Sequence, residues 1–204
     1  MEKRKGNMDE LYYTRGIKTD KKGMQEYMLG LIEIDKAVYE MEMGRKDWAG
    51  NLQDCLKWVE KEPAIYTLLC EKLTNKIVGY NNFAFLDEKN SQMLENGAFG
   101  DMETTPDNIA KLEKNKEYNG FHISMAVMKE HRGVGTKKLI NDFMNRIVKL
   151  KKDFGIQINK VYGEAVSQKG REQMQKLYNG DFMVGSFANI YKKFETTKDN
   201  EIGK

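Results

Sequence analysis

The sequence is poor in the residue types that define several common classes of small protein. Its 204 residues include only two cysteines, two histidines and two prolines. Cys55 and Cys70 are too few for a disulfide framework, and both lie in regularly patterned segments where buried thiols are expected. With His122 and His131 as its only histidines, the chain offers no cluster of metal-binding side chains, so we predict no metal site.

Long apolar runs and an excess of one charge sign are also missing. No stretch approaches the roughly 20 apolar residues that a membrane helix needs, and the N-terminal segment lacks the pattern of a signal peptide. The 34 basic and 31 acidic residues leave a net charge of +3, which implies no general attraction to nucleic acid or membranes. We therefore expect a cytoplasmic monomer or homodimer with no nucleic-acid or membrane partner.

What the sequence does contain is concentrated between His122 and Ile140. Residues 123–128 form an apolar run short enough for a buried strand, and residues 129–135 read Lys-Glu-His-Arg-Gly-Val-Gly, a basic turn with two glycines. Apolar residues then recur at the spacing of an amphipathic helix: Leu139, Ile140, Phe143, Met144, Ile147 and Val148. A strand that leads through glycines into a helix start can bind phosphate, because free backbone N–H groups face the turn.

The details of this turn narrow the kind of anion site. The P-loop pattern is absent, because no Gly-Lys-Ser/Thr follows at the required spacing, and the dinucleotide fingerprint lacks its third glycine. Lys137 and Lys138 lie in the first turn of the predicted helix, where they oppose the helix dipole. Their position favours a bound polyanion over an empty helix start.

The rest of the chain alternates between strand and helix patterns. We expect strands at residues 11–17, 65–73, 77–86 and 158–166, with one or two closing strands at 182–194. Helices are expected from a cap at Thr19 or Asp20 to about Val38, from about Asp47 to Pro63, and after Ser167. Residues 39–46 are predicted to form a loop, and residues 1–10 a frayed end.

Residues 87–119 are long for a connection between two strands. They are rich in carboxylates (Asp87, Glu88, Glu95, Asp101, Glu103, Asp107, Glu113 and Glu117), and Pro106 precedes an expected short helix. Two interpretations stay open: a solvated insertion, or a lid whose carboxylates hold a cationic substrate.

Two segments resemble the GNAT superfamily of N-acetyltransferases. Residues 126–137 are similar to its acetyl-coenzyme A motif, Gln/Arg-x-x-Gly-x-Gly/Ala, and residues 176–182, Lys-Leu-Tyr-Asn-Gly-Asp-Phe, to its Leu-Tyr-x-x-x-Gly-Phe element. Arg132 and Gly135 match the first motif, whereas Lys137 fills its final small position. An alignment on Gly133 and Gly135 places Glu130 where Arg or Gln is expected, so two registers stay open.

The resemblance implies one GNAT-like domain over residues 1–204, of the α/β (α+β) class. Its mixed, mostly antiparallel sheet would have six to seven strands, about four flanking helices and a splay at the central strand. Residues 87–119 would be a family-specific insertion, and residues 196–204 a flexible tail.

The resemblance also implies acetyl-coenzyme A as acetyl donor. Its pyrophosphate would bind Arg132, Gly133, Val134, Gly135, Thr136 and Lys137. The backbone of Met125, Ala126 and Val127 would pair with the pantetheine arm, since an unpaired strand edge needs hydrogen-bond partners. We expect Gly135 to lie at the surface, where a bulky side chain would block the phosphates more than it disturbs the fold.

The implied reaction is direct attack of a primary amine on the thioester in a ternary complex. By resemblance Tyr178 is the acid that protonates the leaving thiolate, and Tyr39, Glu40 and Glu42 border the acceptor site. Glu164 and His122 are considered as bases, but neither is assigned, because water can mediate deprotonation. The acceptor is a small-molecule or peptide amine.

Two other functions remain open. A non-catalytic acyl-coenzyme A sensor would not need Tyr178, whose presence therefore argues against that function. A different nucleotide-binding protein would depend on magnesium, and no suitable Ser/Thr–Asp pair lies beside the loop.

Overall fold

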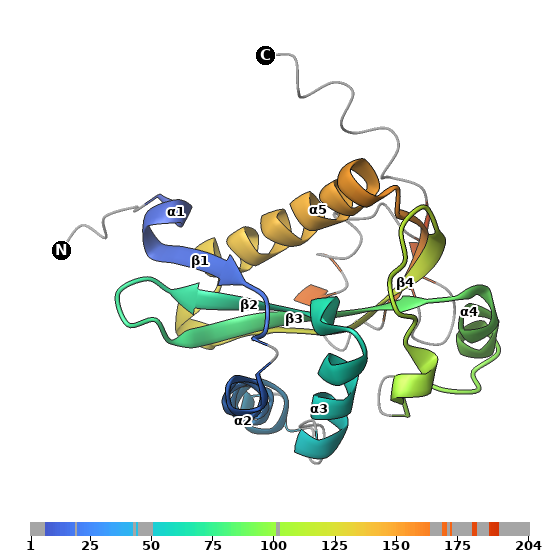
Figure 1. Cartoon of the computed structure of the whole chain (residues 1–204). Coiled ribbons are helices and arrows are strands. Elements are labelled where there is room, and N and C mark those ends of the chain that lie inside the picture. Colours follow the sequence, from blue (N-terminus) through green and yellow to red (C-terminus); the bar gives the residue numbers. More distant parts are fainter. Residues whose placement is uncertain are drawn as a thin grey trace.

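One mixed sheet separates two helical layers in the computed structural model, which describes residues 7–18, 20–42, 44, 51–100, 103–163, 169–170, 172, 181–182 and 188–191 (Figure 1). The strand order is β1-β2-β3-β4-β5-β7-β6. Neighbouring strands are antiparallel except β4 and β5, which are parallel and joined through the long helix α5. The strands are β1 (Tyr12–Arg15), β2 (Tyr66–Glu71), β3 (Ile77–Leu86), β4 (Glu117–Val127), β5 (Gln157–Gly163), β6 (Asp181–Phe182) and β7 (Ala188–Tyr191).

The helices pack on the sheet through the apolar stripes that the sequence predicts. The α-helices are α1 (Met8–Leu11), α2 (Lys21–Asp35), α3 (Leu52–Lys61), α4 (Glu88–Glu95) and α5 (Val134–Phe154), and the shorter helical segments are η1 (Lys36–Glu42, a π-helix), η2 (Pro63–Ile65), η3 (Pro106–Asn108) and η4 (Lys129–His131). Helix α5 covers one face of the sheet, and α2 and α3 cover the other (Figure 1). Leu139, Phe143 and Ile147 of α5 are buried, as expected for one face of a helix.

Several local signals are confirmed. Asp20 caps α2 through a 2.9 Å bond from the Gly23 N–H, and α3 ends directly before Pro63, which cannot continue the helix. Strand β3 has the predicted bounds, Ile77–Leu86. Cys55 and Cys70 are both buried free thiols, and burial raises the pKa of Cys55 to about 11.

Three local predictions are wrong. Residues predicted to fray form α1, because Asn7 and Glu10 make a capping box in which each side chain bonds the other's backbone. Residues 39–42 of the predicted loop belong to the π-helix η1, which buries Tyr39 against the sheet, and residues 43, 45 and 46 lie outside the described residues. Strand β4 begins at Glu117, inside the expected insertion at residues 87–119, so the insertion is shorter than expected.

The mixed α/β architecture agrees with the prediction, whereas the element counts differ. The described residues hold five α-helices instead of about four, since neither α1 nor α4 was predicted. Strands β1 to β5 form the body of the sheet. The prediction of six to seven strands stays a prediction, because β6 and β7 are short segments bounded by residues outside the described part.

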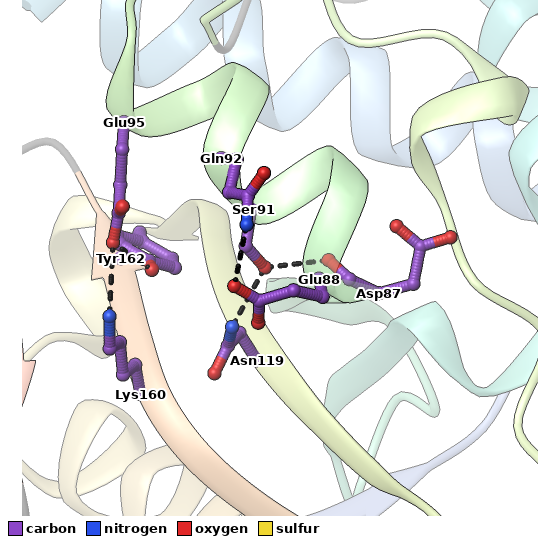
Figure 2. A network of polar contacts seen from close by, with 8 residues as sticks. All are labelled: Asp87, Glu88, Ser91, Gln92, Glu95, Asn119, Lys160 and Tyr162. Atoms are coloured by element: carbon purple, nitrogen blue, oxygen red, sulfur yellow. Dashed lines mark hydrogen bonds and ion pairs between the residues drawn. The ribbon is translucent and has the colours of Figure 1, made fainter.

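The insertion is held to the sheet by its own polar side chains (Figure 2). Asp87 caps α4 by accepting from the Asn90 N–H at 2.8 Å, and Ser91 accepts from the Asn119 side chain of β4 at 2.8 Å. Glu95 accepts from the Tyr162 hydroxyl at 2.5 Å and from Lys160 at 3.2 Å. These carboxylates anchor α4 to the sheet, which favours a structural insertion over a lid that binds cations.

Candidate active site

The turn between β4 and α5 has the geometry of an anion site. Gly133 caps α5 with φ 84° and ψ −92°, a conformation that favours glycine, and no side chain caps this helix end. The first helical bond runs from the Lys137 N–H to the Gly133 carbonyl at 3.0 Å. The N–H groups of Val134, Gly135 and Thr136 precede it and therefore have no acceptor within the helix. Three backbone donors and the positive end of the helix dipole thus meet at one place.

Gly135 has a different role from the one predicted. It is buried, and a side-chain carbon added there would lie 3.1 Å from Leu69 Cδ2 and 3.5 Å from Tyr12 Cζ. The glycine therefore lets α5 approach β1 and β2 closely. A bulky residue at Gly135 would push the helix off the sheet, so the expectation that such a substitution spares the fold is wrong.

Some basic side chains of the turn make contacts within the protein, and others are exposed. Arg132 is exposed, and its Nε donates to the Val127 carbonyl at 2.9 Å, which ties the turn to the last residue of β4. Lys137 is exposed beside the helix start. Lys138, predicted to favour a polyanion, instead pairs with Asp9 at 2.8 Å and with Asp142 at 3.2 Å. It holds α1 against α5, and the exposed cations beside the helix start are Arg132 and Lys137.

Strand β4 presents an open edge just before this turn. Its pairing with β5 runs from Glu117 to His122, and in the described part of the chain Ile123 to Val127 pairs with β3 alone. At the point of divergence the β3 register shifts, because Asn82 faces Ser124 while Phe83 faces His122. Ile123 is the extra residue of a β-bulge, a feature that bends a strand and re-aims its side chains.

The alternation of the β3–β4 ladder decides which backbone groups face this open edge. The Met128 N–H donates to the Val78 carbonyl at 2.9 Å. The backbone N–H and C=O groups of Ala126 therefore face β3, and those of Met125 and Val127 point away from β3. The Met125 carbonyl accordingly lies 3.5 Å from the Tyr39 hydroxyl, and the Val127 carbonyl accepts from Arg132. Of the three residues predicted to bind the pantetheine arm, Met125 and Val127 have backbone groups oriented for it, and Ala126 does not.

A buried polar cluster lies on the α2 face beside this edge, and no local sequence pattern predicts it. The Tyr80 hydroxyl donates to Asp35 Oδ1, and Ser124 Oγ donates to the Tyr80 hydroxyl at 3.2 Å. Burial, with the nearby Asp35 carboxylate, raises the pKa of Tyr80 well above its ordinary value, so the hydroxyl keeps its proton. Tyr39 and Glu40 lie in η1 next to this cluster, and the Glu42 side chain is outside the described residues.

His122 belongs to the opposite face and to the core. Its Nε2 bonds Asn81 Oδ1, and its ring packs 5.5 Å from the Phe83 ring and 5.1 Å from the Phe143 ring. Burial lowers the pKa of His122 to about 4. The imidazole is therefore neutral at pH 7 and a weak base. The other base considered, Glu164, and the predicted acid Tyr178 lie outside the described residues.

The described residues also limit other kinds of site. They contain no group of three or more His, Cys, Asp or Glu side chains arranged to hold a metal ion. None of their helices combines the length and apolarity that crossing a membrane requires.

Solved structures place this arrangement among known folds. The loading GNATL domain of CurA from Lyngbya majuscula superposes with a TM-score of 0.54 at 16% identity, over 79% of this chain and 68% of that domain. The protein has the GNAT fold. The NatB acetyltransferase complex bound to CoA and MES (TM-score 0.52, 13% identity, 87% of this chain and 95% of that one) and AtaTR bound with AcCoA (0.51, 14%, 90% and 95%) share it.

Among the comparisons with known proteins, the comparison of three-dimensional structures is the one that identifies this fold. No protein-family model and no curated protein sequence matches the chain. Of the solved structures just named, one is described as an acetyltransferase complex and one as a GNATL domain, and two were determined with coenzyme A or its acetyl form bound. At such low identity the comparison establishes the fold, and the chemistry has to be argued from this chain's own residues.

Proposed function

We propose that the protein is an N-acetyltransferase that moves an acetyl group from acetyl-coenzyme A to a primary amine. The observation that carries the proposal is the continuity of two features: the open edge of β4 at Met125 and Val127 leads directly into the uncapped start of α5 at Gly133. A backbone edge suits the amide-containing pantetheine arm, and the helix start suits the pyrophosphate.

In this proposal the pyrophosphate binds the N–H groups of Val134, Gly135 and Thr136, with Arg132 and Lys137 beside it. The thioester carbonyl lies against the β4 edge, where a backbone N–H polarises it. Attack by the amine forms the N–C bond, and collapse of the intermediate breaks the C–S bond. Tyr178 donates a proton to the departing thiolate, a role that rests on its resemblance to the family motif.

The acceptor is a small molecule or a peptide with a free amine. Fold alone does not select among these, because one fold supports many substrates. A cytoplasmic location and a monomeric or homodimeric state stay predictions from the sequence.

The decisive experiment measures thiol release from acetyl-coenzyme A in the presence of a panel of amines. We expect amine-dependent release with at least one member of the panel, and acetyl-coenzyme A alone should raise the melting temperature by mass action. At 100 times its dissociation constant a ligand stabilises the fold by about 2.7 kcal/mol.

The same two measurements separate the alternatives. Binding of acetyl-coenzyme A without turnover of any amine would favour a sensor. If millimolar acetyl-coenzyme A produced no binding heat and no melting shift, both acyl-coenzyme A functions would be ruled out.

A further inference from the structure

A chain of buried polar side chains crosses the α2 face of the sheet and ends where β4 opens. It runs from Ser124 of β4 through Tyr80 of β3 to Asp35, the last residue of α2. We propose, building on the acetyltransferase function above, that this Ser124–Tyr80–Asp35 relay removes the proton from the acceptor nitrogen. Ser124 would be a catalytic residue that contacts the amine, and Tyr80 and Asp35 would be positioning residues that act through it.

The direction of the hydrogen bonds supports a relay toward Asp35. The Tyr80 hydroxyl donates its proton to Asp35, so the Tyr80 oxygen accepts the hydrogen bond from Ser124. The lone pairs of Ser124 Oγ are then available to accept an N–H from a bound amine. Ser124 is half-buried, whereas Tyr80 is 2% and Asp35 9% exposed, so the relay leads from an accessible end into the interior.

The accessible end lies next to the proposed position of the thioester. Ser124 directly precedes Met125, the first residue whose backbone faces the open edge. From the other side the π-helix η1 brings the Tyr39 hydroxyl to 3.5 Å from the Met125 carbonyl. An amine that contacts Ser124 would therefore be adjacent to an acyl group held along β4, and such proximity is a large part of catalysis.

Asn82 provides an independent sign that an N–H donor belongs here. It lies directly across from Ser124 in the β3–β4 ladder, so the two side chains share a face. Asn82 is 2% exposed, and its Oδ1 is a buried acceptor without a hydrogen-bond partner in the described part of the chain. Buried polar atoms are nearly always satisfied, so this oxygen calls for a donor. A primary amine has two N–H groups, one for Asn82 and one for Ser124.

The proton and electron bookkeeping closes within one catalytic cycle. The neutral amine attacks the thioester carbon, the N–C bond forms, and the nitrogen becomes positively charged. One N–H proton passes to Ser124 Oγ as the Ser124 proton passes to Tyr80 and the Tyr80 proton to Asp35. The C–S bond then breaks and the thiolate takes a proton from Tyr178 or water. Asp35 returns its proton to solvent, and Tyr178, where it was the donor, regains a proton from solvent.

The surroundings leave Asp35 as the acidic group of the cluster. The titratable groups that face Asp35 and Tyr80 are Tyr39 of η1, Cys55 of α3 and Tyr66 of β2. Cys55 keeps its proton at neutral pH, because burial and the Asp35 carboxylate both raise its pKa. Tyr80 also keeps its proton, so it serves as a conduit and not as a base.

The test measures kcat from pH 6 to 9 with saturating acetyl-coenzyme A and an amine that the wild type acetylates. Ser124→Ala should lower kcat about 10²-fold at pH 7, the low end for general base catalysis, with unchanged affinity for acetyl-coenzyme A by calorimetry. The loss should shrink as hydroxide takes over at high pH. Ser124→Thr keeps the hydroxyl and should restore most of the rate.

A double variant distinguishes a relay from two unrelated packing roles. Asp35→Asn should lower kcat to a similar extent, and Ser124→Ala combined with Asp35→Asn should be no worse than either alone, because the residues act as a unit. Ser91→Ala is the matched control: Ser91 is a buried serine of α4 that is hydrogen-bonded to Asn119 of β4, away from the relay. It should leave kcat and its pH profile unchanged.

Two results would overturn the relay in an active enzyme: wild-type kcat and pH profile in Ser124→Ala, or losses in the two single variants that multiply in the double variant. Should Asp35→Asn fail to fold, the comparison of Ser124→Ala with Ser124→Thr decides alone. A wild-type protein that binds acetyl-coenzyme A but acetylates no amine would instead count against the acetyltransferase proposal itself.

Discussion

Gly133 is the residue on which the geometry of the turn depends. Its φ of 84° costs an L-residue about 1–3 kcal/mol, so Gly133→Ala should relax the turn and displace the N–H groups behind it. We expect affinity for acetyl-coenzyme A to fall at least about tenfold by calorimetry, equivalent to about 1.4 kcal/mol. Gly16→Ala is the control, since Gly16 has open space around it and no positive φ. Equal affinities in the two variants would exclude the turn as the phosphate site.

Tyr178 carries the proposed acid function, and its hydroxyl can be removed without its ring. Tyr178→Phe should lower kcat by roughly 10²-fold and leave the affinity for acetyl-coenzyme A nearly constant. Stability should change by no more than about 1 kcal/mol, the usual value of one hydrogen bond. Steady-state kinetics and thermal melting check both parts. Wild-type turnover at neutral pH would refute an obligatory acid but not acetyl transfer.

At the scale of elements, β4 is the strand whose two edges differ along its length. It pairs with β3 from Asn119 to Val127 and with β5 only from Glu117 to His122, so one strand supplies both the centre of the sheet and its open edge. The first half of β4, which lies in the centre of the sheet, is tightly packed. A side-chain carbon added at Gly120 would lie 2.1 Å from Phe83 Cζ, so the Phe83 ring fills the space above this glycine.

Gly120→Ala should therefore destabilise the protein by about 1–3 kcal/mol, the usual cost of overpacking a core. Gly30→Ala makes a matched comparison, because Gly30 lies inside α2 and a side-chain carbon added there would lie 3.8 Å from Ile77 Cδ1, an ordinary contact distance. Alanine there should stabilise the fold by about 0.5–1 kcal/mol through helix propensity. Denaturant unfolding measures both. A Gly120→Ala protein as stable as wild type would show that the Phe83 ring can move aside at little cost.

At the scale of the whole molecule, the buried His122 makes stability depend on pH. Its pKa is lowered to about 4 in the folded protein from 6.5, so between these values the unfolded chain binds more protons. Stability then rises with pH, and it is lost as the pH falls from about 6.5 toward 4.

We expect this one group to account for a loss of about 2–3 kcal/mol between pH 7 and 4.5, since one pKa unit corresponds to about 1.4 kcal/mol. His122→Gln keeps an amide that can bond Asn81 but does not titrate. The free energy of unfolding of this variant should therefore fall by about 2–3 kcal/mol less than that of the wild type over the same pH range. Urea unfolding at both pH values gives the comparison. Parallel losses in the two proteins would mean that His122 is not buried in its neutral form.

Much of the architecture was already present in local patterns. The spacing of apolar residues predicted α2, α5 and the β2–β3 pair, Asp20 and Pro63 marked helix ends, and the glycines after β4 marked the turn. These signals are readable because each depends on residues a few positions apart. The elements that were missed depend on less obvious local chemistry, such as the capping box of α1 and the π-helix η1.

The active-site chemistry depended on contacts that no local pattern contains. Asp35, Tyr80 and Ser124 are far apart in the chain and meet only because α2 packs across β3 and β4. The burial of Gly135, the pairing of Lys138 with Asp9 and the neutral state of His122 likewise follow from which face each residue occupies. The sequence by itself determined most of the elements and the glycine turn between β4 and α5, since periodicity and caps are local. Only the tertiary structure decided which side chains meet at the open edge of β4, because strand register and helix packing set those distances.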